Sequence, residues 1–141
     1  MPLQYHPGQG HVVICDFNVG FIEPEMVKRR PAIIMCPAMK TRPGLCTVVA
    51  LSTTPPTYPM PYHSEITLPF ALPPPYDAGS HWVKADMINT VGFRRLNLFS
   101  LGKDMNGKRR YMNTYIGDDL LREVQRCMLR AVGLASLTKS L

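Results

Sequence analysis

Proline limits most strongly what this chain can form. The sequence contains 14 prolines, and eight of them fall between Pro55 and Pro75. Proline lacks a backbone donor and its ring clashes with the preceding helical turn, so closely spaced prolines break helices. The middle of the chain therefore excludes a helical bundle. We expect loops at 55–63 and 69–80 around a short strand at 64–68.

Short apolar segments predict strands in most of the remaining first hundred residues. Each segment is rich in β-branched residues and is bounded by glycine, proline or polar turn residues. Besides the strand at 64–68, the predicted strands cover residues 11–17, 31–36, 45–51 and 81–86, the last continuing through 87–91. Residues 92–116 mix strand-like and helical patterns, so the sequence does not settle their structure.

One helix is expected near the C-terminal end, from about Asp118 to Val132. Apolar residues recur there at helical spacing and form one stripe. They are Leu120, Leu121, Val124, Cys127, Met128, Ala131 and Val132. Asp118 and Asp119 suit the positive end of the helix dipole, Gly133 is a typical stop, and the tail 135–141 is expected to be frayed. Strands followed by one packed helix predict an α+β fold with a small, strongly bent antiparallel sheet or barrel.

Length and composition limit the organisation and location of the protein. The chain has 141 residues, 45% of them hydrophobic and 18% charged, as in ordinary globular proteins. We expect a single domain covering residues 1–141. No apolar run approaches the roughly 18–20 residues that a membrane helix needs, and the N-terminus lacks the pattern of a signal peptide. These features predict a cytoplasmic protein with no membrane partner.

The charge balance favours an anionic partner. Sixteen Lys and Arg residues against ten Asp and Glu residues give a net charge of +6. At this size that charge suits a nucleic acid, an acidic protein, or both in turn.

The cysteines and histidines do not form a recognisable metal site. Cys15, Cys36, Cys46 and Cys127 include no C-x-x-C pair, and we expect reduced thiols rather than disulfides. The four histidines are scattered without metal-ligand spacing, so we interpret them as solvated or structural. Glycine motifs for phosphate or dinucleotide binding are also missing from the sequence. We therefore expect no metal and no cofactor.

Hydroxyl, cationic and carboxylate side chains are enough for one reaction of a basic protein, the cleavage of RNA through its own 2′-OH. The RNA supplies the nucleophile in this reaction. The protein supplies a proton acceptor, a proton donor and cations that stabilise the pentacoordinate phosphorane.

Four segments carry a family pattern in a fixed order. They are Gly10–Phe17, Glu25–Ile34, Val48–Thr53 and Trp82–Val91. In order and spacing they resemble the MazF/PemK (Kid) toxins of type II toxin–antitoxin systems. The shared pattern is a G-x-[IV]-x-x-x-D-F-like strand and E-x(4)-R-P before an apolar strand, then V-V-P-[ILVC]-[ST]-[ST] and [KR]-x-D-Q-[IV]-x-[ST]-[IV]. With the helix that ends in Val-Gly-Leu, the resemblance covers about residues 8–134, which we take as the core of the domain.

The sequence departs from the family pattern at several positions. Ala50 stands where the family often has proline, and Met87 where it often has glutamine. Pro24 occupies the place of a histidine found in some members before the loop glutamate. The proline-rich segment 55–80 is expanded.

The resemblance implies a fold, an activity and partners. It implies a homodimer of SH3-like/CcdB-like antiparallel β-barrels, each with a C-terminal amphipathic helix. The implied activity is that of an mRNA interferase, a metal-independent, sequence-selective endoribonuclease acting on single-stranded RNA. Because the 2′-OH is the nucleophile, the products carry 2′,3′-cyclic phosphate and 5′-OH ends. An acidic antitoxin is the implied protein partner.

The arginine and hydroxyl residues of the family motifs have clear counterparts. Arg30 matches the arginine of the R-P pair at the base of the substrate groove, where a guanidinium can bind phosphate in a bidentate way. Ser52 and Thr53 match the hydroxyl pair, which can hydrogen-bond the scissile phosphate. The alternatives are a surface arginine and ordinary turn chemistry at a strand end.

Three further residues match the acid–base positions. Glu25 corresponds to the loop glutamate and could accept the 2′-OH proton; the alternative is a solvated carboxylate. Lys84 and Asp86 match the [KR]-x-D pair, and their i, i+2 spacing on a strand places them on one face. Asp86 could be the base and Lys84 a proton donor or phosphate clamp, while a structural ion pair is the alternative. The sequence does not divide acid and base among the three.

Other residues are candidates for RNA binding. We expect Lys28 and Arg29 to attract RNA, and Trp82 to stack a base, although a core or dimer-surface role is more common for tryptophan. The run Lys108–Tyr111 with Lys103 suits binding to the RNA backbone, but a solvated turn is the preferred interpretation.

Two other functions fit parts of the sequence. CcdB-like relatives use the same barrel to inhibit DNA gyrase without nuclease activity, but an inhibitor has no need of the E-x(4)-R-P and S-T elements. A degenerate family member would keep the fold and the antitoxin binding without cleavage. The changes at Ala50 and Met87 keep that alternative open.

Overall fold

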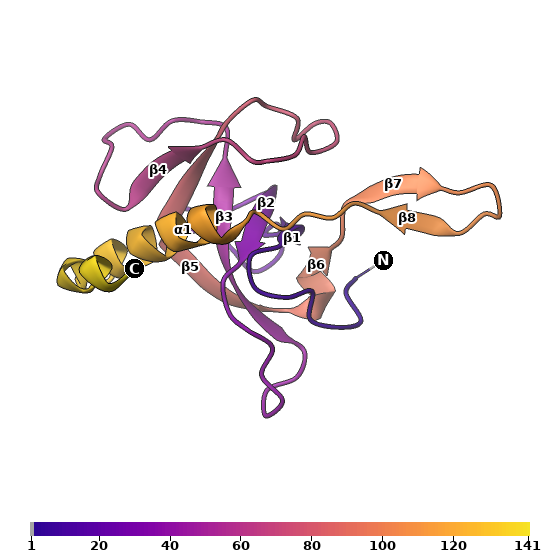
Figure 1. Cartoon of the computed structure of the whole chain (residues 1–141), viewed down its shortest axis with the longest axis horizontal. Coiled ribbons are helices and arrows are strands. Elements are labelled where there is room, and N and C mark those ends of the chain that lie inside the picture. The colour runs from indigo at the N-terminus through magenta and orange to yellow at the C-terminus, as the bar shows by residue number, and fades with distance from the viewer. Residues whose placement is uncertain (1) are drawn as a thin grey trace.

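The structure of the protein is a computed structural model that describes residues 2–141. Within these residues, six strands form one antiparallel sheet in the order β4–β5–β3–β2–β1–β6 (Figure 1). The strands are β1 Val12–Asp16, β2 Arg29–Ile34, β3 Leu45–Ser52, β4 His63–Ile66, β5 His81–Gly92 and β6 Leu96–Asn97. The strands expected up to residue 91 are thus confirmed to within two residues at each end.

The sheet is strongly bent but not closed. Val49 of β3 lies opposite Ile88 of β5, whereas Leu51 lies opposite Val83, so β5 carries extra residues at this point. Such a bulge bends a strand and lets it pass from one neighbour to the next. The α+β class is confirmed, but in the described chain the expected barrel remains open. The short strands β4 and β6 are its two edges and do not pair with each other.

Each face of the sheet buries its own apolar cluster. Residues alternate between the two faces of a strand, so Val12 belongs to one cluster and Val13 to the other. The first cluster packs against the helix α1 (Asp118–Ala131), which contributes the fully buried Val124 and Cys127. The second cluster lies on the opposite face and includes Ala32, Val48 and Ala50.

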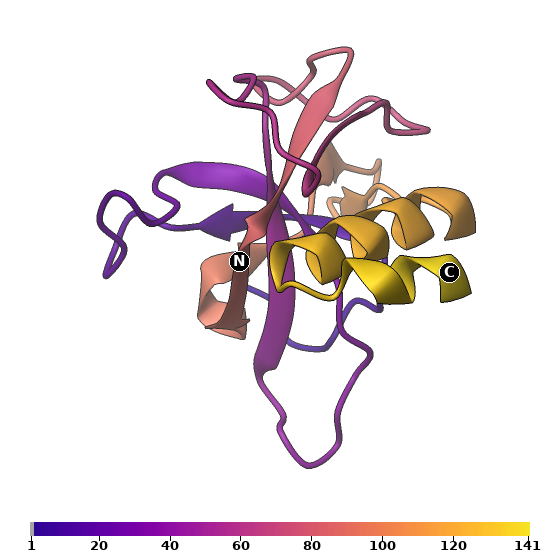
Figure 2. The same cartoon turned by 90° about the vertical axis from the view of Figure 1, so that its left-hand side faces the viewer.

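The helix occupies the expected segment and ends at the expected glycine. Gly133 has a φ of +82°, and its N–H donates to the carbonyl of Arg130. The N–H of Leu134 donates to the carbonyl of Leu129 over 2.8 Å, which completes a Schellman motif. After this turn a 3-10 helix, η2 (Ala135–Ser140), runs back alongside α1 (Figure 2). The expectation of a frayed tail was wrong, because residues 135–140 form this 3-10 helix. The guanidinium of Arg126 donates to the carbonyl of Leu141 and helps to hold the tail in place.

The segment that the sequence did not settle forms four small elements, one of which is the edge strand β6. A 3-10 turn, η1 (Phe93–Arg95), joins β5 to β6. The strands β7 (Ser100–Lys103) and β8 (Arg109–Tyr111) then form a separate two-stranded hairpin. Figure 1 shows that this hairpin extends away from the main sheet. No helix of the described residues is long and apolar enough to cross a membrane.

Candidate functional site

A pocket of about 170 Å³ lies at the end of the sheet where β2 begins, β3 ends and β5 begins. Because these neighbouring strands are antiparallel, the three termini meet at one edge. The proline-rich loop before β5 covers one side of the pocket. The lining residues are Arg29, Arg30, Pro31, Leu51, Ser52, Thr53, Pro75, Tyr76 and His81.

The guanidinium of Arg30 is held in place by its neighbours. Its Nε donates to the carbonyl of Val27 over 2.8 Å, and its Nη1 donates to Ser52 Oγ over 3.4 Å. Lys28 takes a left-handed φ of +75°, and this bend turns the loop into β2 directly before Arg30. The other N–H groups of Arg30 have no acceptor within residues 2–141, so they remain available to an anionic ligand.

Ser52 completes the contact with Arg30. Its side chain is buried, and its Oγ accepts hydrogen bonds from Arg30 and from the N–H of Thr54, the latter over 3.1 Å. A hydroxyl has two lone pairs and one proton, so these two bonds leave the proton free to donate. The bond to Thr54 is also the turn chemistry expected at a strand end. Thr53 lies exposed at the rim of the same pocket.

Trp82 and Lys84 of β5 each face a residue of a neighbouring strand close to the pocket. Trp82 of β5 lies opposite Ser52 of β3, and Lys84 lies opposite His63 of β4. Burial lowers the pKa of Lys84; the charge of Asp86 acts to raise it and that of Arg30 to lower it. Lys84 therefore interacts electrostatically with both Asp86 and Arg30.

Within residues 2–141, Asp86 does not form the ion pair with Lys84 that was the structural alternative to a catalytic role. Its Oδ1 lies 3.7 Å from Nε2 of His63 instead. Burial lowers the pKa of His63, although the charge of Asp86 acts to raise it. The lowered pKa favours the neutral ring. The side chain of Asp86 is 37% exposed, so solvent can reach its carboxylate.

Glu25 lies on the loop before β2 and does not line the pocket. Its Oε2 accepts the N–H of Ile22 over 2.9 Å, so the side chain stabilises the turn formed by residues 22–25. Lys28 and Arg29 are both exposed, and Arg29 borders the pocket. The structure therefore gathers Arg29, Arg30, Ser52 and Thr53 but leaves Glu25 on the neighbouring loop.

His81 is a pocket residue that the sequence analysis did not single out. It is only 3% exposed, so it is not solvated. Its Nε2 lies 3.3 Å from the carbonyl of Tyr76, and its Nδ1 has no hydrogen-bond partner within residues 2–141. Burial lowers the pKa of His81, which favours the neutral ring. With the proton on Nε2 toward Tyr76, Nδ1 carries a lone pair.

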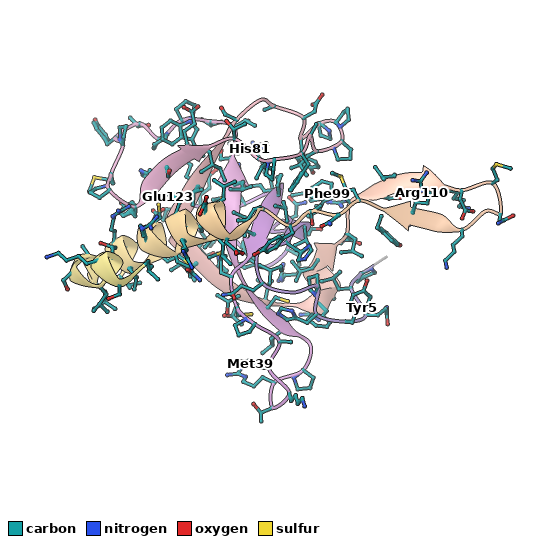
Figure 3. The ribbon with its side chains drawn as sticks, in the orientation of Figure 1. Tyr5, Met39, His81, Phe99, Arg110 and Glu123 are labelled. Carbon is teal, nitrogen blue, oxygen red and sulfur yellow. The ribbon has the colours of Figure 1, made fainter. Side chains whose placement is uncertain are left out.

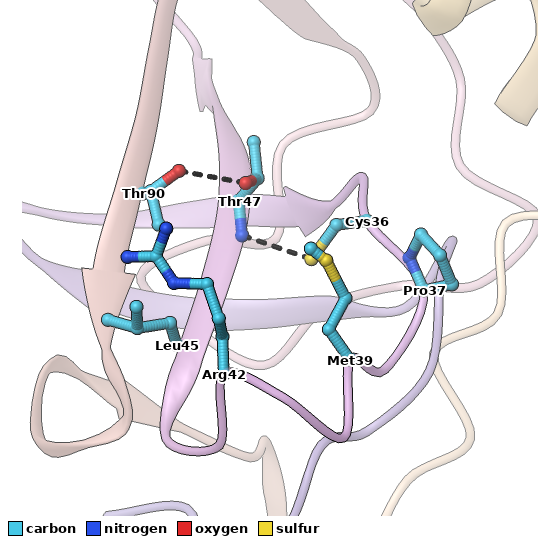
Figure 4. Close-up of a pocket in the computed structure, with 7 residues that line it drawn as sticks. All are labelled: Cys36, Pro37, Met39, Arg42, Leu45, Thr47 and Thr90. Carbon is cyan, nitrogen blue, oxygen red and sulfur yellow. Dashed lines mark hydrogen bonds between the residues drawn. The ribbon is translucent and has the colours of Figure 1, made fainter.

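A second pocket, of about 110 Å³, lies at the opposite end of β3 (Figure 4). Its lining residues are Cys36, Pro37, Met39, Arg42, Leu45, Thr47 and Thr90. Cys36 Sγ accepts the N–H of Thr47 over 3.2 Å, and the hydroxyls of Thr47 and Thr90 lie 2.8 Å apart. None of the residues predicted for RNA cleavage lines this pocket.

The cysteines are free thiols, as expected. Cys15, Cys46 and Cys127 are buried, and Cys36 is half-buried. Burial raises the pKa of Cys15 and Cys46 to about 12 and that of Cys127 to about 11, so these thiols stay protonated. Within residues 2–141, no three His, Cys, Asp or Glu side chains gather as potential metal ligands.

Comparison with known proteins identifies the family. Residues 8–130 match the family described as the PemK-like, MazF-like toxin of type II toxin–antitoxin systems. The chain therefore belongs to this family of toxins. The match includes the whole sheet, the hairpin and nearly all of α1.

Two relatives resemble the chain over almost its full length. An uncharacterized protein from Haemophilus influenzae is 27% identical and covers 95% of each chain. The putative uncharacterized protein YifN from Escherichia coli is 26% identical and covers 97% of this chain and 99% of its own.

Three solved structures share the fold. MazF from Deinococcus radiodurans is 24% identical with a TM-score of 0.61, over 92% of this chain and 99% of its own. The MazE–MazF structure from the same organism is 23% identical with a TM-score of 0.55, over 93% and 99%. An endoribonuclease in complex with its cognate antitoxin, from Mycobacterial species, is 19% identical with a TM-score of 0.51, over 91% and 94%.

Proposed function

We propose that this protein is a metal-independent endoribonuclease toxin that cleaves single-stranded RNA in the pocket at the end of the sheet. The observation that carries the proposal is the Arg30–Ser52 contact. It holds a guanidinium with free N–H groups next to a hydroxyl with a free proton. A phosphodiester seated there would be bound by charge and by directed hydrogen bonds, which is what a phosphorane transition state requires.

The proposed reaction needs no group from outside the protein and the RNA. The 2′-oxygen attacks the adjacent phosphorus while a carboxylate takes its proton. The bond from phosphorus to the 5′-oxygen breaks, and that oxygen takes a proton from an acid. The products are a 2′,3′-cyclic phosphate and a 5′-OH. Arg30 and Ser52 stabilise the charge on the phosphorane oxygens.

We assign the base to Asp86 and the acid to Lys84. Asp86 interacts electrostatically with Lys84, which in turn interacts with Arg30, so these residues act on one region of the surface. The lowered pKa of Lys84 makes its ammonium a better proton donor. Glu25 is the weaker candidate, because its carboxylate already accepts a hydrogen bond within its own loop.

The remaining predicted residues would bind rather than react. Arg29 and Lys28 would attract the RNA backbone, Thr53 would contact the phosphate from the rim, and Trp82 would stack a base beside Ser52.

We further propose that the protein is a cytoplasmic, single-domain toxin that acts as a homodimer and is inhibited by an acidic antitoxin. The net charge of +6 favours an acidic partner. Two structural neighbours are complexes with MazE or with a cognate antitoxin, which supports the same kind of partner. An apolar groove formed by α1, the sheet and the C-terminal residue supports self-association, because exposed apolar patches mark interaction surfaces.

The direct test is cleavage of a long single-stranded RNA by the purified protein in EDTA. The wild-type protein should give discrete fragments with 5′-OH ends. Arg30→Ala should abolish these fragments, whereas Arg42→Ala, which removes an exposed arginine at the opposite end of β3, should keep the same cleavage pattern. Circular dichroism of both variants would check that each is folded.

Two results would contradict the proposal. Full activity of Arg30→Ala would remove the pocket from the reaction. Absence of cleavage by the folded wild-type protein would favour a binding-only toxin, and gyrase inhibition would then be measured.

A further inference from the structure

The β7–β8 hairpin is an exposed, cationic arm of the described chain. Every residue of both strands is exposed. The hairpin carries four cations, which are Lys103, Lys108, Arg109 and Arg110, and a single carboxylate, Asp104. None of the four cations forms an ion pair within the part of the chain that the structure describes. Like charges this close repel one another, so their clustering on one small element favours an anionic ligand.

Asp104, the one carboxylate of the arm, stabilises the turn that joins β7 to β8. Asp104 Oδ1 accepts the N–H groups of Asn106 and Lys108, each over 2.9 Å. The carbonyl of Asp104 accepts the N–H of Gly107, which has a φ of +78°. Because Asp104 is held at the tip by these bonds, it is not placed to pair with the cations along the strands.

The base of the arm is joined to the wall of the candidate pocket. Phe99 directly precedes β7, is 3% exposed and meets the ring of Tyr76 edge to face, with 6.0 Å between ring centroids. Tyr76 lines the pocket and its carbonyl lies 3.3 Å from His81. Figure 3 shows the resulting order from His81 through Phe99 to Arg110 on the hairpin. The arm therefore starts where the pocket ends.

We propose that the β7–β8 hairpin binds the phosphate backbone of single-stranded RNA beyond the cleavage site. The inference rests on the proposed function, since it takes the pocket as the place of cleavage. Exposed Lys and Arg side chains bind phosphates without reading the base sequence. The arm would thus increase the affinity for long RNA and leave the chemical step and the recognition sequence unchanged.

Two changes to the arm test this inference. The triple variant Lys108→Ala, Arg109→Ala and Arg110→Ala removes three charges from an exposed surface. Its matched control removes three exposed cations elsewhere, through Lys40→Ala, Arg42→Ala and Lys139→Ala.

The second change removes the arm itself. The carbonyl of Phe99 accepts the N–H of Met112 over 3.1 Å, which is the hydrogen bond that closes a two-residue hairpin turn. Asn-Gly between Phe99 and Met112 can therefore replace residues 100–111.

The readout is the dissociation constant for 2′-O-methylated single-stranded RNA, which has no 2′-OH to attack. Probes of about 4 and about 16 nucleotides, the range of common single-strand site sizes, are titrated at several salt concentrations. For the long probe, we expect the triple variant to reduce the slope of log K against log salt by about 2, or about 0.7 for each cation. Affinity for the short probe and the control variant's affinity for both probes should remain unchanged.

Different outcomes separate this inference from the proposed function. If the arm variants bind the long probe as the wild type does, the arm does not bind RNA and the inference fails. The same holds if they lose affinity only for an acidic peptide such as polyglutamate, which would make the arm a protein-binding element. Arm-dependent RNA binding by a wild type that cleaves no RNA would support the arm and contradict the proposed function alone.

Discussion

The pocket and the β7–β8 hairpin both present arginine to solvent, but they hold it in different ways. Arg30 is half-buried, and its guanidinium donates to Val27 and Ser52. Arg109 and Arg110 are exposed on strands that lie outside the main sheet. A fixed charge suits a transition state, which needs donors at defined positions. A loosely held charge suits attraction of a polyanion, which depends on charge more than on geometry.

The largest expected difference between the two regions concerns folding. Leu51 lines the pocket and is fully buried, whereas Leu101 of the hairpin is 53% exposed. Leu51→Ala should lower the free energy of unfolding by about 2–5 kcal/mol, because it leaves a cavity. Leu101→Ala should change it by less than about 0.5 kcal/mol. Urea denaturation measures both, and equal losses would show that the hairpin belongs to the cooperative core.

The second difference concerns the shape of the cation. Arg30→Lys keeps the charge but loses the planar fork and the hydrogen bond to Val27. We expect kcat for RNA cleavage to fall about 100-fold, the usual cost of one misplaced donor at a transition state. Arg110→Lys should leave kcat unchanged, since charge alone is needed there. A fully active Arg30→Lys variant would contradict the distinction.

A smaller effect is expected at the hydroxyl pair. Ser52→Ala removes a donor to the phosphate and the acceptor of the Arg30 hydrogen bond, so cleavage should slow about tenfold, or about 1.4 kcal/mol. Thr53→Ala acts at the exposed rim and should slow it less. Initial rates at saturating RNA measure both variants. A larger effect at Thr53 would place the phosphate outside the pocket.

The smallest expected effect is a shift in titration. The pKa of Lys84 is lowered by burial and by Arg30, and the charge of Asp86 opposes this. The Lys84 ammonium should therefore lose its proton at a pH below the ordinary lysine value. Asp86→Asn removes the opposing charge and should lower the pKa further. An NMR titration of the Lys84 ε-carbon tests this without requiring activity, and Arg109→Ala in the hairpin is the control that should not move it. An upward shift in Asp86→Asn would contradict the assigned interaction.

The sequence predicted the parts of the fold that depend on local patterns. The strand boundaries, the helix from Asp118 and its stop at Gly133 follow from periodicity, breakers and capping. The open sheet could not be predicted, because closure depends on whether two short edge strands meet. The 3-10 helix after Gly133 was also missed, since it depends on a contact between Arg126 and the C-terminal residue.

The residues of the candidate site could be predicted from the sequence only where they belong to family motifs on neighbouring strands. Arg30 and Ser52 are 22 positions apart, and the antiparallel pairing of β2 with β3 brings them together. His81 gave no comparable signal, because its burial depends on the long loop that precedes it. The same holds for the hairpin, whose basic run was interpreted as a solvated turn. Its relation to the pocket depends on the contact of Phe99 with Tyr76.

The central claim is that the pocket at the end of the sheet cleaves RNA through the 2′-OH of the substrate. The most direct measurement compares an unmodified single-stranded RNA with its fully 2′-O-methylated form, in EDTA, with analysis of the product ends. The account predicts that the protein binds both RNAs but cleaves only the unmodified one, leaving 2′,3′-cyclic phosphate and 5′-OH ends. Cleavage of the methylated RNA, or products with 5′-phosphate ends, would contradict it.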